Sequence, residues 1–493
     1  MFSSDRCPSR CTLRFFSLIL IFLFITGAMA QAQVWANHAH SYGGVGTDYG
    51  AAYKANTSGE RFMTGYFSDS MIVGSNVLTS RGDTDIILAK EGGWFVQIGG
   101  TGADQTTDLA FDSAGNIYAT GWFTGNAKFS STDGHGLTMQ GSSETIFLAK
   151  YSATGVVQWV QTGIDDLGGI NRGHGLAVDQ VTGAVFLMGL TQGNVAFSSS
   201  NGTSQVVAGV RTWHMFLVRY DTGGNFKWGQ TNVAAPNSVP HGIAIDAVDN
   251  VYVSGWFEGS STFLSADGNN LSMTGLSQPV QTAPDYPDDA FLVKYDANGN
   301  VKWASDVGGY KAMGLSLAVS SQGNVSMTGF VGNIGGGTIQ QGRTVVTSQP
   351  AGTVTSLGTG QHTNPYNRDL IVLTYDPSGV LLTAIRKGGT NNEIGHGIAW
   401  SGNNLYVAVD TQNTSTLADV LIVAKFTGAT VDWMRSAPGA GTGSPEQDSR
   451  LSLGLDGEIL VTGWFTGTAT FGPSTLVSHG AEDMFFARLL TER

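Results

Sequence analysis

Three histidines stand at the same place in a repeated sequence pattern. His174, His241 and His396 each come directly before a short apolar run, GLAVD, GIAID and GIAWS respectively. Three imidazoles that converge at one point could bind a transition metal ion. The other copies of the pattern have unrelated residues at this place, namely Tyr49, Thr107, Leu315 and Leu451. We therefore favour structural roles for the histidines, keep them as candidate metal ligands, and predict no other cofactor and no catalytic residue.

Aspartates recur at two further places in the pattern. Calcium binding needs several carboxylates that converge on one loop, and only Asp285, Asp288 and Asp289 lie close together in the sequence. Aspartate side chains commonly accept hydrogen bonds from backbone N–H groups in turns. We therefore predict that the recurring aspartates cap turns. They are Asp85, Asp289, Asp369 and Asp483 before one kind of apolar run, and Asp112, Asp179, Asp246 and Asp456 after another.

An aromatic position recurs as well. Aromatic rings on a surface can stack on sugar rings, but the residues that flank these positions are apolar, as is typical of side chains packed between two sheets. We predict that these rings belong to the core. The residues are Tyr66, Trp122, Trp256, Phe330 and Trp464.

Motifs of common catalytic sites are missing from the sequence. It has no G-x-S-x-G, no H-E-x-x-H, no phosphate-binding G-x-x-x-x-G-K and no EF-hand loop. A catalytic site would have to be assembled from residues far apart in the chain. For that alternative, an exported hydrolase or lyase, the candidates are the histidines together with Asp165, Asp166 or Glu393.

The N-terminal residues predict export. Three arginines precede the apolar run FFSLILIFLFITG, which is followed by small residues up to Ala30. This order is typical of a secretory signal peptide. We expect residues 1–30 to be removed and the mature protein to be periplasmic or extracellular. Cys7 and Cys11 lie in the removed segment, so the mature chain has no cysteine for disulfides or for thiolate metal sites.

Composition narrows the class of protein. The net charge of −13 becomes −15 when Asp5 and the three arginines of the predicted signal peptide are removed. An acidic protein of this kind is not expected to bind nucleic acid or anionic lipid. No later run is long and apolar enough to cross a membrane. Helical periodicity is absent while β-branched and aromatic residues are frequent, so we predict an all-β chain.

Repeats predict the architecture. Each copy contains four apolar runs separated by turns rich in glycine and asparagine, which is typical of four antiparallel strands. The second run of each copy ends at a glycine, except that one copy, NLYVAVD, has Ala408 at this place. The fourth run often carries tryptophan. The glycines are Gly65, Gly121, Gly189, Gly255, Gly329 and Gly463.

The two ends of the chain complement each other. The seventh copy has its first three strands and stops before a fourth, while Val34–Gly44 has the tryptophan and the two glycines of a fourth strand. Pairing Val34–Gly44 with Asp483–Leu489 would complete the copy. We therefore predict one domain, residues 31–493, folded as a seven-bladed β-propeller of four-stranded antiparallel blades, with the N-terminal strand closing the last blade. We expect this ring to be a monomer.

The copies share a recurring sequence, which is G-I-A-[VI]-D, then [GD]-N-[VI]-Y-[VA]-[TS]-G-[WY]-F, then D-x-F-[LF]-[VA]-[KR]-Y-D-x-x-G-x-x-x-W. It resembles the SBBP repeat, a β-propeller repeat of secreted and cell-surface bacterial proteins. The resemblance covers nearly the whole mature chain. It implies a propeller fold and export. The family has no common reaction, so the resemblance implies no catalytic residues.

Two functions remain open from the sequence. We favour a secreted, non-catalytic propeller that binds a glycan, a protein or a cell-surface polymer. The longest departures from the repeat, Gly332–Asn367 and Gln278–Asp288, are the predicted binding loops, because function often lies on long loops. The alternative is the hydrolase or lyase at the mouth of the central channel.

Overall fold

The chain folds entirely into β-strands over the residues that the structure describes. This computed structural model describes residues 34–36, 39–235, 237–275, 288–308, 310–332, 343–349, 353–359, 368–389, 391–412, 419–441, 451–455 and 457–490. The predicted signal peptide, residues 1–30, lies outside this range, and so do Asp285, Asp456 and most of Gln278–Asp288. The described residues contain no helix that is long and apolar enough to span a bilayer.

The strands form antiparallel four-stranded units that follow one another along the chain. The first two units are β3 (Asp48–Ala55), β4 (Arg61–Val73), β5 (Asn76–Lys90) and β6 (Phe95–Gly100), then β7 (Asp104–Phe111), β8 (Ile117–Ser130), β9 (Gly136–Tyr151) and β10 (Val157–Asp165). The next two are β11 (Arg172–Val178), β12 (Val185–Thr191), β15 (His214–Tyr220) and β16 (Phe226–Ala235), then β17 (Ser238–Ile245), β18 (Val251–Glu258), β21 (Asp288–Tyr295) and β22 (Val301–Gly308). They are followed by β23 (Tyr310–Val319), β24 (Val325–Gly332), β27 (Arg368–Tyr375) and β28 (Leu381–Lys387), and by β29 (Asn392–Ser401), β30 (Asn404–Gln412), β31 (Asp419–Thr427) and β32 (Thr430–Pro438). The last part of the chain forms β33 (Ala440–Gly441), β34 (Leu451–Leu453), β35 (Ile459–Phe465) and β38 (Asp483–Leu490).

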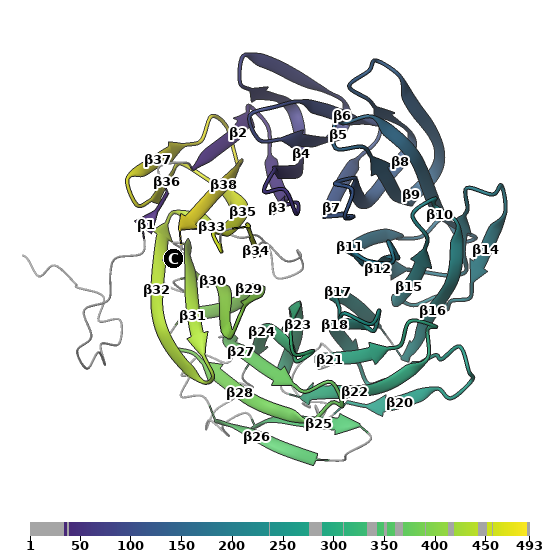
Figure 1. Cartoon of the computed structure of the whole chain (residues 1–493), viewed down its shortest axis with the longest axis vertical. Coiled ribbons are helices and arrows are strands. Elements are labelled where there is room, and N and C mark those ends of the chain that lie inside the picture. The colour runs from purple at the N-terminus through teal and green to yellow at the C-terminus, as the bar shows by residue number, and fades with distance from the viewer. Residues whose placement is uncertain are drawn as a thin grey trace, which may run out of the picture.

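Figure 1 shows these units side by side around a common centre, with β3, β7, β11, β17, β23 and β29 nearest to it. The first strand of each unit is therefore the innermost one. The second and third strands lie further out, and the fourth lies toward the rim. This arrangement places the first strands, which carry the three candidate histidines, at the centre of the molecule.

The two ends of the chain pair with each other. Strands β1 (Val34–Trp35) and β2 (His40–Gly44) both run antiparallel to β38. Trp35 is opposite Leu489, and Ser41 is opposite Phe485. The sequence predicts this pairing of Val34–Gly44 with the last strand.

Neighbouring units are joined by hairpins that the sequence analysis did not predict. Between their second and third strands, several units send a hairpin back to the fourth strand of the preceding unit. The hairpin β13 (Val195–Ser198) and β14 (Ser204–Val207) pairs with β10, and β19 (Ser260–Phe263) and β20 (Leu271–Thr274) pair with β16. In the same way, β25 (Arg343–Gln349) and β26 (Thr353–Thr359) extend the sheet of β22.

The last of these hairpins corrects one prediction. Gly332–Asn367 is expected from its composition to be a binding loop, yet β25 and β26 lie within it and form ladder hydrogen bonds with the preceding unit. A strand paired in a sheet satisfies the exposed edge of β22. The described part of this insertion therefore joins two units.

The recurring tryptophan and the turn glycine form one contact between units. The Trp228 indole donates a hydrogen bond to the Ala297 carbonyl oxygen at 2.9 Å, and its ring lies against Gly299 in the turn between β21 and β22. Gly299 has a φ of +82°, and a Cβ there would lie 3.1 Å from the indole. Only glycine combines this backbone conformation with the close approach. The same indole-to-carbonyl bonds join Trp94 to Ala153, Trp159 to Thr222 and Trp303 to Pro377.

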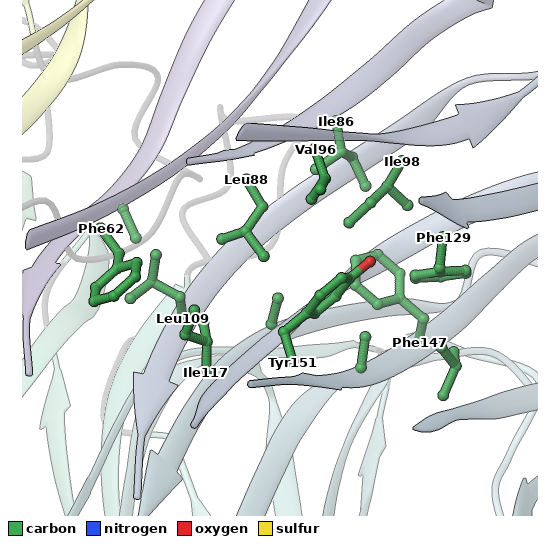
Figure 2. Close-up of a cluster of buried hydrophobic side chains, with 14 of the residues drawn as sticks. Phe62, Ile86, Leu88, Val96, Ile98, Leu109, Ile117, Phe129, Phe147 and Tyr151 are labelled. Atoms are coloured by element: carbon green, nitrogen blue, oxygen red, sulfur yellow. The ribbon is translucent and has the colours of Figure 1, made fainter. Parts of the chain in front are cut away.

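The core lies between the units. Figure 2 shows one such cluster, in which Phe62 and Leu88 of the β3–β6 unit face Leu109, Phe147 and Tyr151 of the β7–β10 unit. Similar clusters of buried side chains lie between later units. Burial of apolar surface between sheets is the main driving force for this arrangement.

One alignment made from the sequence is wrong by one residue. Ala408 is predicted to occupy the position of the recurring glycine of the second strands. These strands continue past that glycine in the structure, as β18 does from Gly255 to Glu258. Gly395 pairs with Val409, as Pro240 pairs with Gly255. Val409 therefore occupies the glycine position, and Ala408 lies one residue earlier. The segment NLYVAVD has no glycine to mark this position, so spacing alone did not locate it.

Candidate functional site

The three histidines share a structural feature of the innermost strands. Each of them forms a β-bulge, which is an extra residue without a partner on the neighbouring strand. His174 lies between Gly173 and Gly175 at such a shift of register, and His241 and His396 occupy the same place in β17 and β29. A bulge changes the direction of its side chain, so these histidines do not follow the regular alternation of side chains along the strand.

The structure corrects two members of this set. The bulged residue of β3 is Ala51 rather than Tyr49, because the pairing shifts between Gly50 and Ala52. Leu451 pairs with Val461 and so belongs to the register two residues after the bulge. Thr107 and Leu315 are bulged, as predicted.

The structure brings two of the histidines together. The rings of His174 and His241 are 6.0 Å apart between centroids, and Nδ1 of His174 lies 2.8 Å from the Pro240 carbonyl oxygen. Both are buried. His396 is also buried but does not line the cavity described below. Among the described residues, no three His, Cys, Asp or Glu side chains are grouped so as to hold a metal ion.

A cavity of about 280 Å³ lies among the innermost strands. Trp400 adds an aromatic wall, and the polar lining comes from Lys54, Asp108, His174, His241, Ser316 and Ser452. The apolar lining comes from equivalent positions of five strands, namely Leu176, Ile243, Leu317, Ile398 and Leu451.

The Lys54–Asp108 ion pair is the charged feature of this cavity. Nζ of Lys54 lies 2.5 Å from Oδ1 of Asp108, and Oδ2 of Asp108 accepts a hydrogen bond from the Leu176 backbone N–H at 3.0 Å. The two side chains come from adjacent units, and Asp108 also reaches a third. This network holds the side chains of the ion pair in place on the cavity wall.

The sequence analysis missed these two residues, although a signal was present. Lys54 occupies a register in which the other inner strands have Ala110, Ala177, Ala244, Ala318, Ala399 and Ser452. A single lysine at a position where the other copies have small residues indicates that a partner for its charge lies nearby. The partner Asp108 stands where other strands have small residues such as Gly242 and Ser316.

The acidic residues proposed for a catalytic site lie elsewhere. Oδ2 of Asp165 accepts a hydrogen bond from the Gly169 N–H at 2.9 Å, and Asp166 pairs with Asn194. Glu393 accepts a hydrogen bond from the Gly389 N–H, and burial raises the pKa of its carboxyl to about 7. None of the three acids lines the cavity that contains His174 and His241.

Residues 93–126 match the family model SBBP, which is described as a beta-propeller repeat. The chain carries an SBBP repeat. The matched SBBP segment begins next to Trp94, contains the whole of β7 and ends within β8. It therefore includes the tryptophan that contacts the following unit, and the bulge residue Thr107.

Two further comparisons are more distant. An uncharacterized WD repeat-containing protein of Acanthamoeba polyphaga mimivirus is 23% identical over an alignment of 394 residues that covers 69% of this chain and 27% of that protein. The chain thus spans 27% of the length of this relative. Among solved structures, selenomethionine-substituted virginiamycin B lyase from Staphylococcus aureus has a TM-score of 0.29 and 10% identity, with 78% of this chain and 94% of that chain covered. At this TM-score, the likeness has no bearing on function.

The prediction that recurring aspartates cap turns is confirmed for several SBBP-like copies. Asp112 accepts hydrogen bonds from the N–H groups of Ala114 and Asn116, and Asp246 does so from Val248. Asp179 caps its turn in the same way. Before third strands, Asp85 accepts from the Arg81 N–H and Asp483 from the His479 N–H, whereas Asp369 forms an ion pair with Arg386.

The prediction of core packing for the aromatic position is also confirmed for most of its members. Tyr66, Trp122, Trp256 and Phe330 are buried. The Arg172 guanidinium lies 4.9 Å from the Trp122 ring centre. Trp464 is half-buried beside Tyr49, whose ring centre is 6.1 Å away. Buried rings of this kind cannot serve as a sugar-stacking platform.

Within the SBBP match, Asp104 forms a junction between two units. Gly100 donates its N–H to Oδ2 of Asp104 at 2.7 Å, and Asp85 of the preceding unit lies nearby. A Cβ on Gly99 would lie 2.7 Å from an oxygen of Asp85 and 2.8 Å from an oxygen of Asp104. The first glycine of the Gly-Gly pair therefore leaves room for two carboxyl groups.

This junction predicts a pH dependence of stability. Burial, together with the nearby charge of Asp85, raises the pKa of Asp104 to about 7. An unfolded aspartate titrates near pH 3.9, so between roughly pH 4 and 7 the folded chain retains a proton that the unfolded chain has lost. The free energy of unfolding must then decrease as the pH rises through this window.

Asp104→Asn removes the titrating group. We expect urea unfolding of this variant at about pH 5 and pH 7 to show a smaller loss of stability with rising pH than the wild type shows. Asp83→Asn, an exposed aspartate of β5, is the matched control. An unchanged slope in Asp104→Asn would mean that Asp104 titrates alike in the folded and unfolded chains.

Proposed function

We propose that this chain is an exported, seven-bladed β-propeller, closed by its N-terminal strand in the last blade, that acts as a non-catalytic binding module. Its ligand would be a protein, a glycan or a cell-surface polymer. The SBBP match and the WD repeat-containing relative support a propeller that takes part in interactions. The apolar run that ends near Ala30 supports export.

The observation that carries the binding proposal is that four polar side chains of the central cavity are held by hydrogen bonds or by an ion pair. Lys54 pairs with Asp108, His174 contacts the Pro240 carbonyl, and Ser452 donates to the Tyr53 carbonyl at 2.7 Å. A nucleophilic site needs a hydroxyl hydrogen-bonded to a base. Here these four side chains bond to backbone groups or to each other as an ion pair, which suits a rigid recognition surface.

A concave site with an aromatic wall and a few fixed polar groups is the usual form of a ligand site. Trp400 supplies the wall, and its indole nitrogen is held by a hydrogen bond to Ser326 Oγ at 3.2 Å. The Lys54–Asp108 pair presents both a cationic and an anionic group. We therefore place the binding site at this cavity rather than on the Gly332–Asn367 insertion.

The test is to probe a glycan array and purified cell-surface proteins and polymers with the labelled full chain, and then to measure Kd for each molecule that binds. We expect Trp400→Ala to weaken binding at least about tenfold, a loss of about 1.4 kcal/mol. Val206→Ala, on the outer hairpin strand β14, is the control and should bind as the wild type does. If Val206→Ala weakened binding and Trp400→Ala did not, the ligand would bind at the rim and not at the cavity.

The alternative of an exported hydrolase or lyase is favoured by one observation, the proximity of His174 and His241 in the same cavity. Metal analysis of the purified protein decides between the two functions. One equivalent of a transition metal, lost in His241→Ala, would support the alternative. We expect the purified wild type to hold no bound transition metal, so that His241→Ala leaves the transition-metal content unchanged.

A further inference from the structure

Pairs of acidic side chains recur where one unit meets the next. The charges of Asp85, Asp369 and Asp483 act on Asp104, Glu393 and Asp48, respectively. In each junction the pair comes from the third strand of one unit and the first strand of the next. A backbone N–H of the connecting Gly-Gly segment donates to the second acid, as Gly44 does to Oδ2 of Asp48 at 2.9 Å. Two neighbouring carboxyl groups in a buried site are stabilised when one of them keeps a proton or when a positive charge lies beside them.

Two of these junctions contain their own cation. In the first, the Arg81 guanidinium lies 3.9 Å from Asp85, and Gln97 donates a hydrogen bond to the same carboxylate at 2.6 Å. In the second, Nε of Arg386 lies 2.7 Å from Oδ2 of Asp369. An arginine side chain therefore supplies the compensating charge at both junctions.

The third junction has no arginine or lysine in an ion pair with its acids among the described residues. His479 precedes Asp483 by four residues, as Arg81 precedes Asp85, and its Nδ1 lies 3.1 Å from Oδ2 of Asp483. Its side chain is 60% exposed to solvent. A neutral imidazole can donate this hydrogen bond without supplying a charge.

Both carboxyl groups of this junction are inaccessible to bulk solvent. Asp48 and Asp483 are each 0% exposed. On both side chains, Oδ1 has no hydrogen-bond partner within the described part of the chain. Gly43 packs directly on the Asp483 carboxylate, since a Cβ there would lie 2.2 Å from Oδ2. In the first junction Oδ1 of Asp104 also lacks a partner, but only the third junction has, over the described residues, such an oxygen on both of its acids and no arginine beside them. Buried acceptor atoms without donors need an explanation.

We propose that a hard divalent cation of the calcium class binds at this junction through Oδ1 of Asp48 and Oδ1 of Asp483. Carboxylate oxygens are the preferred ligands of such ions, and backbone carbonyls and water complete their coordination shells. The cation takes the place of the arginine that serves the other two junctions. This proposal does not depend on the binding function proposed above.

The position of the site gives it a structural role. Asp483 begins β38, the last strand, and Asp48 begins β3, directly after β2. Strand β2 pairs with β38. A cation held by both acids therefore links the two ends of the chain, in a mature protein predicted to have no cysteine for a disulfide.

The test uses the full chain freed of metal with a chelator and titrated with CaCl2 by calorimetry. We expect one equivalent to bind and the Tm to rise. Asp48→Asn and Asp483→Asn should each weaken binding at least about tenfold, while Asp83→Asn should bind as the wild type does. Since each Asn variant removes a buried charge, we expect it to unfold no earlier than the wild type in chelator, which separates lost binding from lost folding.

Three outcomes would overturn the proposal. The first is a folded wild-type chain that binds none of Ca²⁺, Mg²⁺ and Mn²⁺. The second is binding that persists unchanged in both Asn variants. The third is binding of Zn²⁺ alone that disappears in His479→Gln, which would indicate an imidazole site for a softer metal.

Discussion

Trp35→Ala is expected to lower the free energy of unfolding of the full chain by about 3–5 kcal/mol, the usual cost of removing a large aromatic side chain from a core. Trp35 is 4% exposed and its ring centre lies 5.3 Å from that of Phe471 in an edge-to-face contact. Its indole nitrogen donates a hydrogen bond to the Ser436 carbonyl of β32 at 3.1 Å. The strand that carries it pairs with β38.

Trp35 therefore links three parts of the chain that are distant in sequence. It joins the N-terminal strand to β32 and to the hairpin formed by β36 (Thr468–Phe471) and β37 (Ser474–Val477). Loss of the ring would weaken the attachment of β1, and the end of β38 would lose its partner. We expect the last unit to open first during unfolding.

Urea unfolding followed by far-UV circular dichroism measures this effect, and hydrogen exchange of β38 shows where opening begins. Val45→Ala, at a side chain that is 74% exposed in the same region, is the control and should change stability little. If Trp35→Ala were as stable as the wild type, with unchanged exchange in β38, pairing of the chain ends would not contribute to stability.

Trp303→Ala is expected to have a similarly large effect, and the same substitution at Trp433 a clearly smaller one. Trp303 is 2% exposed and donates to the Pro377 carbonyl of the next unit at 3.1 Å. Its ring lies against Gly379, where a Cβ would be 2.9 Å away. Removal of the ring leaves a cavity between two units and takes one hydrogen bond from the Pro377 carbonyl, which keeps its bond from Lys294 Nζ at 2.9 Å.

Trp433 occupies the equivalent place in β32 but is only half-buried. Its indole nitrogen has no hydrogen-bond partner among the described residues. In the other units this partner is the carbonyl of a turn between third and fourth strands. In the last unit, β1 and β2 from the start of the chain pair with β38, and the described residues contain no turn that joins β38 to them.

The two variants therefore separate two contributions to the free energy of unfolding. One comes from the contact of Trp303 with the next unit, and the other from any tryptophan side chain at this place in a fourth strand. Both should be compared by urea unfolding at one pH, with far-UV circular dichroism as the signal because the indoles themselves are removed. Equal losses of stability would contradict the assignment of Trp303 to a contact between units.

Much of the architecture could be predicted from the sequence because its signals are local and repeated. Alternation of apolar and turn residues marks the strands, and recurrence of Asp, Gly and Trp at fixed offsets marks the units. The N-terminal segment has the composition of a missing fourth strand, and its pairing with β38 agrees with that reading. The error at Ala408 arises because its segment has no glycine to mark the register. Tyr49 and Leu451 are each two residues away from the bulge register, and their copies have no histidine to mark it.

The candidate sites depend on contacts that no local pattern contains. Lys54 and Asp108 come from different units, and Asp48 and Asp483 come from opposite ends of the chain. Each of these residues is unremarkable within its own segment. Its role follows from the side chains placed beside it by the arrangement of the units.

The strands, the repeat and the turn-capping role of the aspartates can be predicted from the sequence alone, since hydrogen bonds and apolar burial within one unit depend on residues close together in the chain. The sequence does not show which charges lie side by side or which carboxylate oxygens lack a donor. The energy of a buried charge depends on its neighbours in space, and here those neighbours come from other units.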